Sequence, residues 1–380
     1  MPAPRLQALH DAGQSLWLDY IDRPMLHDGE LARRIRDDVL TGMTSNPAIF
    51  EKALAQGSAY DAQVESLGAG HTAWQLFEEL AAADVRAACD LFRRVYDETR
   101  GLDGYVSLEV SPNVANDAEG TIREARRLWA LVDRPNVMIK VPGTDAGCVA
   151  LRQLVADGIN VNVTLLFAVE AHERVIEAYL AGLETRAATG APLSGIASVA
   201  SFFVSRVDTE VDKRLDARVA AGALSAQAAT ALKGTAAVAN ARLAYRLFGQ
   251  RFSGPRWSAL AARGARVQRP LWASTSTKNP SYRDVFYVEE LVGPQTVNTL
   301  PPATLEAFRD HGVVRRTLDA DAGAAERALA AVEGAGISVR QVTDQLLVEG
   351  LASFQKSFDT LLAGLAAKAS ALGRPVAAGR

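Results

Sequence analysis

Cysteine and histidine are scarce in this chain of 380 residues. The two cysteines, Cys89 and Cys148, are too few and too far apart for a disulfide framework or a cysteine metal site. We expect both to pack as small apolar side chains in a reducing compartment. The five histidines form no ligand pair at helical or strand spacing, so the sequence predicts no metal site.

Excess charge and long apolar runs are also missing. A formal net charge of −3 and a pI near 6.0 provide no general attraction for nucleic acid or an anionic membrane, so any anion site must be local. No apolar run approaches the roughly 20 residues of a membrane helix. Residues 1–13 lack the cationic and apolar segments of a signal peptide. We therefore expect a cytoplasmic protein with neither nucleic acid nor a membrane as partner.

Lysine is rare as well, with seven among 41 basic residues. One of them, Lys140, interrupts an apolar strand pattern, Val-Met-Ile-Lys-Val-Pro-Gly, at 137–143. An ammonium buried without a partner is costly, so such a lysine either pairs with a carboxylate or loses its proton and acts as a nucleophile. The residues alone leave both interpretations open: a structural ion pair, or an amine that forms Schiff bases.

Eight short strand patterns alternate with helical patterns along the chain. The strands are expected at 15–21, 42–47, 105–112, 137–143, 159–167, 195–206, 269–275 and 296–300. This alternation predicts the α/β class and one (β/α)8 barrel domain over 1–380. Helical insertions are expected around 48–100 and 207–265, and C-terminal helices from about 304, with Thr304 as a candidate cap. Neither a dinucleotide fingerprint nor a Walker sequence supports an open-sheet nucleotide fold.

Polar side chains recur in the second halves of the predicted strands or just after them. They are Asp19, Thr44, Asn46, Glu109, Lys140, Asn162, Thr164 and Ser201. Any one of them could be a satisfied interior hydrogen bond, and Asp19 could cap a turn. Their coincidence at the carboxyl ends of several strands is typical of a barrel active site, so we interpret the set as one site.

Four segments resemble the transaldolase family. They are Thr-Ser-Asn-Pro at 44–47, Ser-Leu-Glu-Val at 107–110, Ile-Lys-Val-Pro-Gly at 139–143 and Gly-Ile-Asn-Val-Asn-Val-Thr-Leu-Leu-Phe at 158–167. The similarity runs from about Ser15 to the end of the chain, and Thr-Val-Asn-Thr-Leu-Pro at 296–301 looks like the longer transaldolase type. The resemblance implies a class I aldolase barrel without a metal or organic cofactor. Such an enzyme passes a dihydroxyacetone unit from a ketose phosphate to an aldose phosphate.

The resemblance also implies a role for each matching residue. Lys140 would form the Schiff base, Asp19 would be the acid and base, and Glu109 with Thr164 would hold the water used to form and hydrolyse the imine. Three further matches, Asn46, Asn162 and Ser201, would bind the hydroxyl groups of the dihydroxyacetone moiety. Arg206 would bind phosphate, and Lys278 stands where the family has a second phosphate-binding arginine, so the charge is kept but a bidentate fork is lost.

Two alternatives to transfer remain from the sequence. The chain could be a fructose 6-phosphate aldolase that releases dihydroxyacetone, or a non-catalytic sugar-phosphate binding barrel in which Lys140 is only a buried ion pair. Sugar phosphates are the partners in each case. The sequence predicts either a monomer or a homodimer, without deciding between them.

Overall fold

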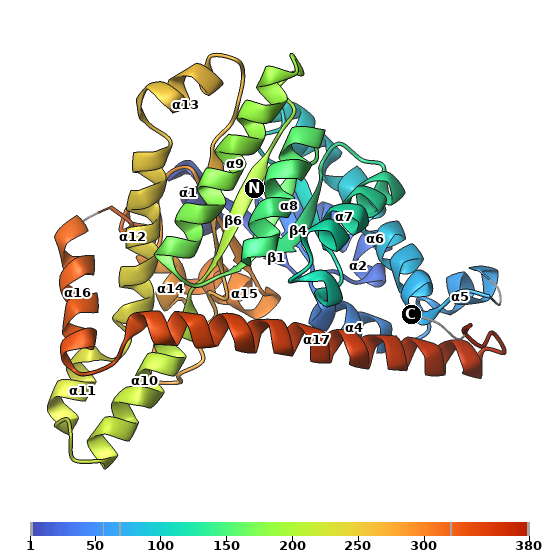
Figure 1. Cartoon of the computed structure of the whole chain (residues 1–380). Coiled ribbons are helices and arrows are strands. Elements are labelled where there is room, and N and C mark those ends of the chain that lie inside the picture. Colours follow the sequence, from blue (N-terminus) through green and yellow to red (C-terminus); the bar gives the residue numbers. More distant parts are fainter. Residues whose placement is uncertain (1–2, 56, 68–69, 320, 378–380) are drawn as a thin grey trace.

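Eight parallel strands close into a barrel in the order β1 to β8 (Figure 1). The computed structural model describes residues 3–55, 57–67, 70–319 and 321–377. The strands are β1 Gln14–Asp19, β2 Gly42–Thr44, β3 Tyr105–Glu109, β4 Val137–Pro142, β5 Val161–Leu166, β6 Ser198–Phe203, β7 Gln268–Ala273 and β8 Thr296–Leu300. All eight predicted strands are therefore present, and the (β/α)8 barrel is confirmed.

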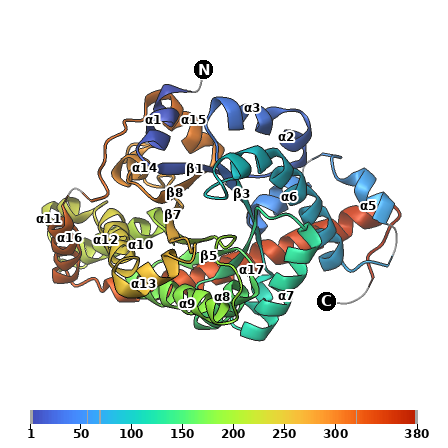
Figure 2. The ribbon, with the colours of Figure 1, turned by 90° about the horizontal axis from the view of Figure 1, so that it is seen from above.

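Helices surround this barrel and extend beyond it (Figure 2). Those of the first half are α1 Pro4–Asp11, α2 Arg23–His27, α3 Glu30–Asp37, α4 Pro47–Ala55, α5 Asp61–Leu67, α6 Ala73–Glu98, the 3-10 helix η1 Pro112–Val114, α7 Ala118–Val132 and α8 Asp145–Asp157. Those of the second half are α9 Val169–Ala188, α10 Ser205–Ala220, α11 Ala226–Leu232, α12 Ala236–Arg251, α13 Gly254–Ala261, α14 Phe286–Glu290, α15 Pro302–His311, α16 Ala322–Gly334 and α17 Val339–Ala371. Within the described ranges, no helix is long and apolar enough to cross a membrane.

The strand register brings the polar side chains of different strands to the same height. Lys140 on β4 pairs with Glu109 on β3 and with Asn162 on β5. Asp19 on β1 pairs with Thr44 on β2. Partners in a parallel ladder point to the same side of the sheet. These side chains therefore point into the barrel interior together, in line with the alternation predicted from the sequence.

A tryptophan fills the middle of the barrel below the polar groups. Trp17 on β1 is fully buried. A Cβ atom added at Gly42, the first residue of β2, would lie 2.5 Å from the indole ring of Trp17. Only glycine leaves room for this ring at that position, so Gly42 lets a large side chain close the barrel beneath the site.

The boundaries of several elements differ from the sequence-based expectation. The region 48–100 forms three helices rather than one continuous helical stretch, with residues 56 and 68–69 outside the described ranges. The strand expected over 195–206 ends at Phe203, and Arg206 lies in the first turn of α10. The expected cap Thr304 is wrong, because α15 begins at Pro302 and Thr304 lies inside it. A proline whose ring presets the helical φ angle begins that helix in place of a hydroxyl cap.

The alternation of β5 breaks at Leu165. Its φ angle is +60°, in the left-handed region, and the register with β6 shifts between Val163 and Leu166. This irregularity follows directly after Thr164, one of the residues predicted for the site. Strained backbone of this kind costs of order 1–3 kcal/mol and persists where the surrounding structure holds it.

The last long helix, α17, spans 33 residues across the carboxyl ends of the strands. It packs against α4, β5 and α10. In Figure 1 it runs horizontally below the barrel, with α10 and α11 extending further down, and in Figure 2 it passes beneath the barrel. The C-terminal region therefore covers the end of the barrel at which the predicted site residues lie.

Candidate active site

A cavity of about 170 Å³ opens at the carboxyl ends of the strands. The residues that line it are Asp19, Thr44, Asn46, Lys140, Thr164, Ser201, Phe203, Arg206, Ala273, Ser274, Ser276, Lys278, Thr299, Pro301 and Phe354. They come from every strand except β3, from the segments that follow the strands, from α10 and from α17. This is the end of a (β/α)8 barrel at which active sites lie.

Lys140 brings its amine to the wall of this cavity. Its side chain is 6 % exposed, and Nζ lies 3.5 Å from Oε2 of Glu109. Nζ also donates a hydrogen bond to the carbonyl oxygen of Ser45 at 3.0 Å. The ion pair that the sequence allowed is therefore present, and the same amine faces a space in which a ligand can reach it.

Glu109 is the carboxylate beside this amine. Its side chain is 8 % exposed, and Oε2 has no hydrogen-bond partner among the described residues. Burial raises the pKa of Glu109, the charge of Lys140 opposes this shift, and the charge of Asp19 adds to it. A carboxyl group in this environment holds a proton more readily than one in water, so Glu109 is suited to giving and taking protons.

Asp19, the last residue of β1, lines the cavity as predicted. Thr44 donates a hydrogen bond from Oγ1 to Oδ1 of Asp19 at 2.7 Å, and the same hydroxyl lies 2.7 Å from Oγ1 of Thr299. Burial raises the pKa of Asp19, whereas the charge of Lys140 and the hydrogen bond from Thr44 oppose the rise. The threonine pair fixes one oxygen of the carboxylate and leaves the other for a ligand.

The neutral residues of β5 and β6 form a chain of hydrogen bonds under the cavity. Ser201 donates to Oδ1 of Asn162 at 2.7 Å, and Asn162 donates through Nδ2 to Ser107 at 3.1 Å. Ser201 lines the cavity, but Asn162 is fully buried and does not. The buried Oγ1 of Thr164 lines the cavity with no hydrogen-bond partner within the described part of the chain.

Asn46 stands at the junction of β2 and α4. Its Oδ1 accepts a hydrogen bond from the backbone N–H of Ile49 at 3.0 Å, and Pro47 is the first residue of α4. The Asn-Pro pair therefore starts this helix. The side chain also lines the cavity, where its amide group can donate to a ligand.

Arg206 provides a partly buried positive charge at the cavity. Its guanidinium carbon lies 5.2 Å from the centre of the Phe203 ring, and the described residues offer it neither an ion pair within 4.0 Å nor a hydrogen bond. Burial lowers the pKa of Arg206, and the charges of Asp19 and of Glu349 on α17 oppose this shift. A cation that burial disfavours is well suited to an anionic ligand.

Lys278 adds a second cation on the segment after β7. Its Nζ donates to Oγ of Ser276 at 2.9 Å. Burial lowers the pKa of Lys278, and the positive charge of Arg206 lowers it further. Two cations close enough to repel each other at the edge of one cavity would attract an anionic ligand.

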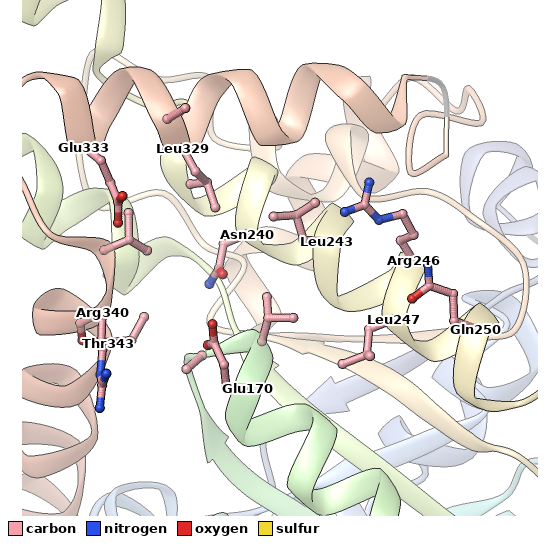
Figure 3. A pocket seen from close by; sticks show the side chains of 14 residues that line it. Glu170, Asn240, Leu243, Arg246, Leu247, Gln250, Leu329, Glu333, Arg340 and Thr343 are labelled. Atoms are coloured by element: carbon pink, nitrogen blue, oxygen red, sulfur yellow. Dashed lines mark hydrogen bonds between the residues drawn. The ribbon is translucent and has the colours of Figure 1, made fainter.

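Among the other cavities of the described residues, a small one of about 10 Å³ borders this site and shares Asn46 with it, and Glu109 lines it too. Another, of about 440 Å³, lies between α9, α12, α16 and α17 (Figure 3). In that cavity Arg246 is already paired with Glu326 at 2.6 Å. Across the described ranges, no group of three or more His, Cys, Asp and Glu side chains could hold a metal ion. The cavity of Lys140 therefore remains the candidate site.

Comparison with known proteins assigns the chain to a family. Residues 16–365 match the model of the transaldolase/fructose-6-phosphate aldolase family. The chain belongs to this family. It is 46 % identical to transaldolase 2 of Nostoc sp. over 98 % of this chain and 99 % of that protein. It is 51 % identical to the transaldolase of Thermobifida fusca over 94 % and 96 %, and 50 % identical to transaldolase 1 of Streptomyces coelicolor over 96 % and 94 %.

Family membership confirms the resemblance seen in the sequence, and the chain is an enzyme of the transaldolase type. Nine residues have a role implied by the resemblance, and the structure brings eight of them to Lys140 or to its cavity wall, Lys140 included; the ninth, Asn162, lies beneath that wall. Sequence reasoning missed the carbonyl group of Ser45, because a backbone contact leaves no residue pattern. It also missed Phe354, which reaches the cavity from a helix that carries no family motif.

Proposed function

We propose that the chain transfers a dihydroxyacetone unit through a Schiff base on Lys140. The donors would be fructose 6-phosphate or sedoheptulose 7-phosphate, and the acceptors erythrose 4-phosphate or glyceraldehyde 3-phosphate, as in the non-oxidative pentose phosphate pathway. The observation that carries the proposal is the amine of Lys140, 3.5 Å from a carboxylate and bordering a cavity that also holds two cations. Sugar phosphates, which the family implies as substrates, match this combination.

The first step joins the amine to the carbonyl carbon of the ketose. Attack gives a carbinolamine, whose hydroxyl group must leave as water to form the protonated imine. Glu109, with its raised pKa, can supply the proton for that departure and later take one from the water that hydrolyses the imine. Oε2 of Glu109 and Oγ1 of Thr164 both lack a hydrogen-bond partner among the described residues, which supports the assignment of both residues to this water.

The second step breaks the bond between C3 and C4 of the sugar. Asp19 takes the proton of the C4 hydroxyl group, the bond electrons move to C3, and the protonated imine accepts them. An aldose phosphate leaves, and a three-carbon nucleophile stays on Lys140. Transfer reverses this step with a new aldehyde: its carbonyl carbon bonds to C3, and Asp19 returns the proton to its oxygen.

Neutral hydrogen-bond donors and cations are proposed to bind different parts of the substrate. Asn46 and Ser201 can bind hydroxyl groups of the three-carbon unit without adding charge. Asn162, which accepts from Ser201, orients that hydroxyl from below. Arg206 and Lys278 are proposed to bind the phosphate group of donor and acceptor.

Borohydride trapping tests this function. Reduction of the wild-type protein with fructose 6-phosphate should add the mass of a three-carbon unit at Lys140, located by peptide mapping. In Asp19→Ala the imine should form but not break down, so the six-carbon adduct should accumulate. A wild-type protein without a label at Lys140 would remove the Schiff-base mechanism. The three-carbon adduct appearing at wild-type rate in Asp19→Ala would move the acid and base role to Glu109.

A fructose 6-phosphate aldolase is the second candidate, since the family description includes this activity. It would use the same lysine and carboxylates and would differ in releasing the three-carbon unit as dihydroxyacetone. Turnover of fructose 6-phosphate without an acceptor separates the two. A non-catalytic binding barrel has less support, because the chain belongs to a family of enzymes and its curated relatives are transaldolases.

The protein is also proposed to work in the cytoplasm as one barrel domain. Both cysteines are free, with Cys89 buried, which suits a reducing compartment. The packing of α1 on α15, and of α17 on α4, ties the two ends of the chain to the same barrel and supports one domain. A monomer and a homodimer both remain compatible with this arrangement.

A further inference from the structure

One aromatic side chain reaches the cavity from outside the barrel. Phe354 belongs to α17 and lines the same space as Lys140. It is 8 % exposed. The only other aromatic residue among those that line the cavity is Phe203, whose ring packs 5.3 Å from Phe167 and carries Arg206 over its face. The ring of Phe203 thus packs against the guanidinium group of Arg206. Phe354, by contrast, forms part of the cavity wall and comes from a helix outside the barrel.

The position of this wall is fixed by close packing one turn before Phe354. A Cβ atom added at Gly350 would lie 3.0 Å from Leu165 and 3.7 Å from Phe167. Leu165 is the residue of β5 with φ +60°, next to Thr164. The irregular end of β5 therefore places the side chain of Leu165 against α17. Gly350, which has no side chain, lets the helix come close to it. Because α17 also packs on α4 and α10, its position relative to the cavity is set from three sides.

An apolar wall matters in this cavity because most of its lining attracts water. Asp19, Lys140, Arg206 and Lys278 are charged, and the remaining strand residues include four hydroxyl groups. The proposed three-carbon nucleophile has two fates. Its C3 atom can bond to the carbonyl carbon of an aldehyde, which is transfer, or it can take a proton. Protonation gives an imine that water hydrolyses to dihydroxyacetone and the free amine, which is release.

We propose that Phe354 is a specificity-determining residue that favours transfer over release by keeping water from the three-carbon intermediate. The inference rests on the proposed function and extends it to the choice between the two activities in the family description. In release, the proton held by Asp19 has to reach C3 through a water molecule; exclusion of water removes this carrier and leaves an arriving aldehyde as the remaining electrophile. No added oxidant or cofactor is needed: the proton that Asp19 took from the C4 hydroxyl balances either outcome.

The test measures the ratio of release to transfer in Phe354→Ala. Release is the dihydroxyacetone formed from fructose 6-phosphate without an acceptor, and transfer is the sedoheptulose 7-phosphate formed when erythrose 4-phosphate is present. Loss of the ring should raise this ratio about tenfold, as expected when one apolar contact of a pocket is removed. Phe354→Leu, which keeps an apolar side chain, should give a smaller rise and also provides the test if the alanine variant does not fold.

A matched control uses the same helix. Leu361 lies seven residues further along α17, is 2 % exposed, and is not among the described residues that line the cavity. Leu361→Ala should lower thermal stability and leave the ratio unchanged. An unchanged ratio in both Phe354 variants, or an equal rise in Leu361→Ala, would overturn the inference.

Borohydride trapping keeps this outcome separate from a failure of the proposed function. A three-carbon adduct at Lys140 in wild type and in the Phe354 variants shows that the chemistry is intact, so an unchanged ratio then counts against Phe354 alone. Absence of the adduct from the wild-type protein would remove the Schiff-base mechanism, and with it the inference.

Discussion

The two ends of the barrel each hold a buried cation beside a carboxylate, but the two ion pairs differ in their hydrogen bonds. At the amino end Arg269 pairs with Asp103 at 3.1 Å, with side chains 8 % and 4 % exposed. Arg269 also donates to Ser15 at 2.7 Å, and Asp103 accepts from Trp17 at 2.9 Å. At the carboxyl end Lys140 and Glu109 are about equally buried, at 6 % and 8 %. Their closest atoms are 3.5 Å apart, and Oε2 of Glu109 has no hydrogen-bond partner within the described residues.

The difference shows what burial is used for at each end. A buried ion pair is tolerated when hydrogen bonds satisfy its remaining polar atoms, as those of Arg269 and Asp103 do. The pair at the carboxyl end is left incomplete, and the missing partners are those that a substrate or a water molecule would supply. Four predictions can break or sharpen this contrast.

The largest effect is expected for Lys140→Ala. Activity should fall at least about a thousandfold, because no other amine borders the cavity at that position. The fold should survive, since Glu109, with its raised pKa, can take a proton once its cation is gone. Steady-state assays and circular dichroism check the two halves of the prediction. Residual activity above about one thousandth of the wild-type value would argue against the Schiff base.

Arg269→Ala should lower stability and leave substrate binding unchanged, the opposite of Lys140→Ala. Removing the cation leaves Asp103 buried without its charge partner, which costs about 3–5 kcal/mol of unfolding free energy. The KM for fructose 6-phosphate should not change in the remaining folded protein. Urea denaturation measures the loss, and Arg256→Ala is the control, because that half-exposed arginine pairs with Glu177 at the surface and should cost no more than about 1 kcal/mol. Equal losses in the two variants would contradict the structural role of Arg269.

Arg206→Ala should weaken phosphate binding. A charge-assisted contact is worth about 1.5–3 kcal/mol, so the KM for phosphorylated sugars should rise by one to two orders of magnitude. Non-phosphorylated dihydroxyacetone should be affected much less as a donor. Lys278→Ala should show the same pattern with a smaller effect, because that side chain is more exposed and lacks a bidentate fork. Equal losses on both kinds of donor would argue against a phosphate site.

The smallest effect concerns stability and pH. The folded-state pKa of Asp19 is raised, chiefly by burial, so its contribution to stability is fully present below the unfolded pKa of about 3.9 and is lost as pH rises through the folded value. Asp19→Asn keeps the acceptor for Thr44 and removes the ionisation. It should therefore be more stable than wild type by about 1 kcal/mol at pH 8 and equal to it near pH 4. Denaturation at both pH values is the measurement, and a gain that is independent of pH would contradict this account.

The sequence predicted the site well where strand alternation determined it. Asp19, Glu109 and Lys140 sit on regular strands, and their period of two was enough to place them inside the barrel. It failed where one conformation breaks the pattern, as at Leu165, because a leucine with φ +60° has no signature in composition. Thr304 was misassigned because a proline two residues earlier already begins the helix.

Contacts between distant segments could not be predicted from the sequence either. Nothing in the pattern of α17 distinguishes Phe354, which lines the cavity, from Leu361, which does not. Both are apolar residues on the buried side of one amphipathic helix. Only the crossing of α17 over the end of the barrel separates the two, and that crossing depends on its packing against α4, β5 and α10 together.

The path of α17 sets an order of events during synthesis. Lys140 leaves the ribosome early, and the last residue of the strands and loops that line the cavity follows at Pro301. Phe354 emerges more than fifty residues later, on a helix that must find α4 and α10 before it can cover the site. A nascent chain can thus possess the reactive amine before it possesses the wall beside it. The wall of the cavity is complete only after α17 has been synthesised and packed.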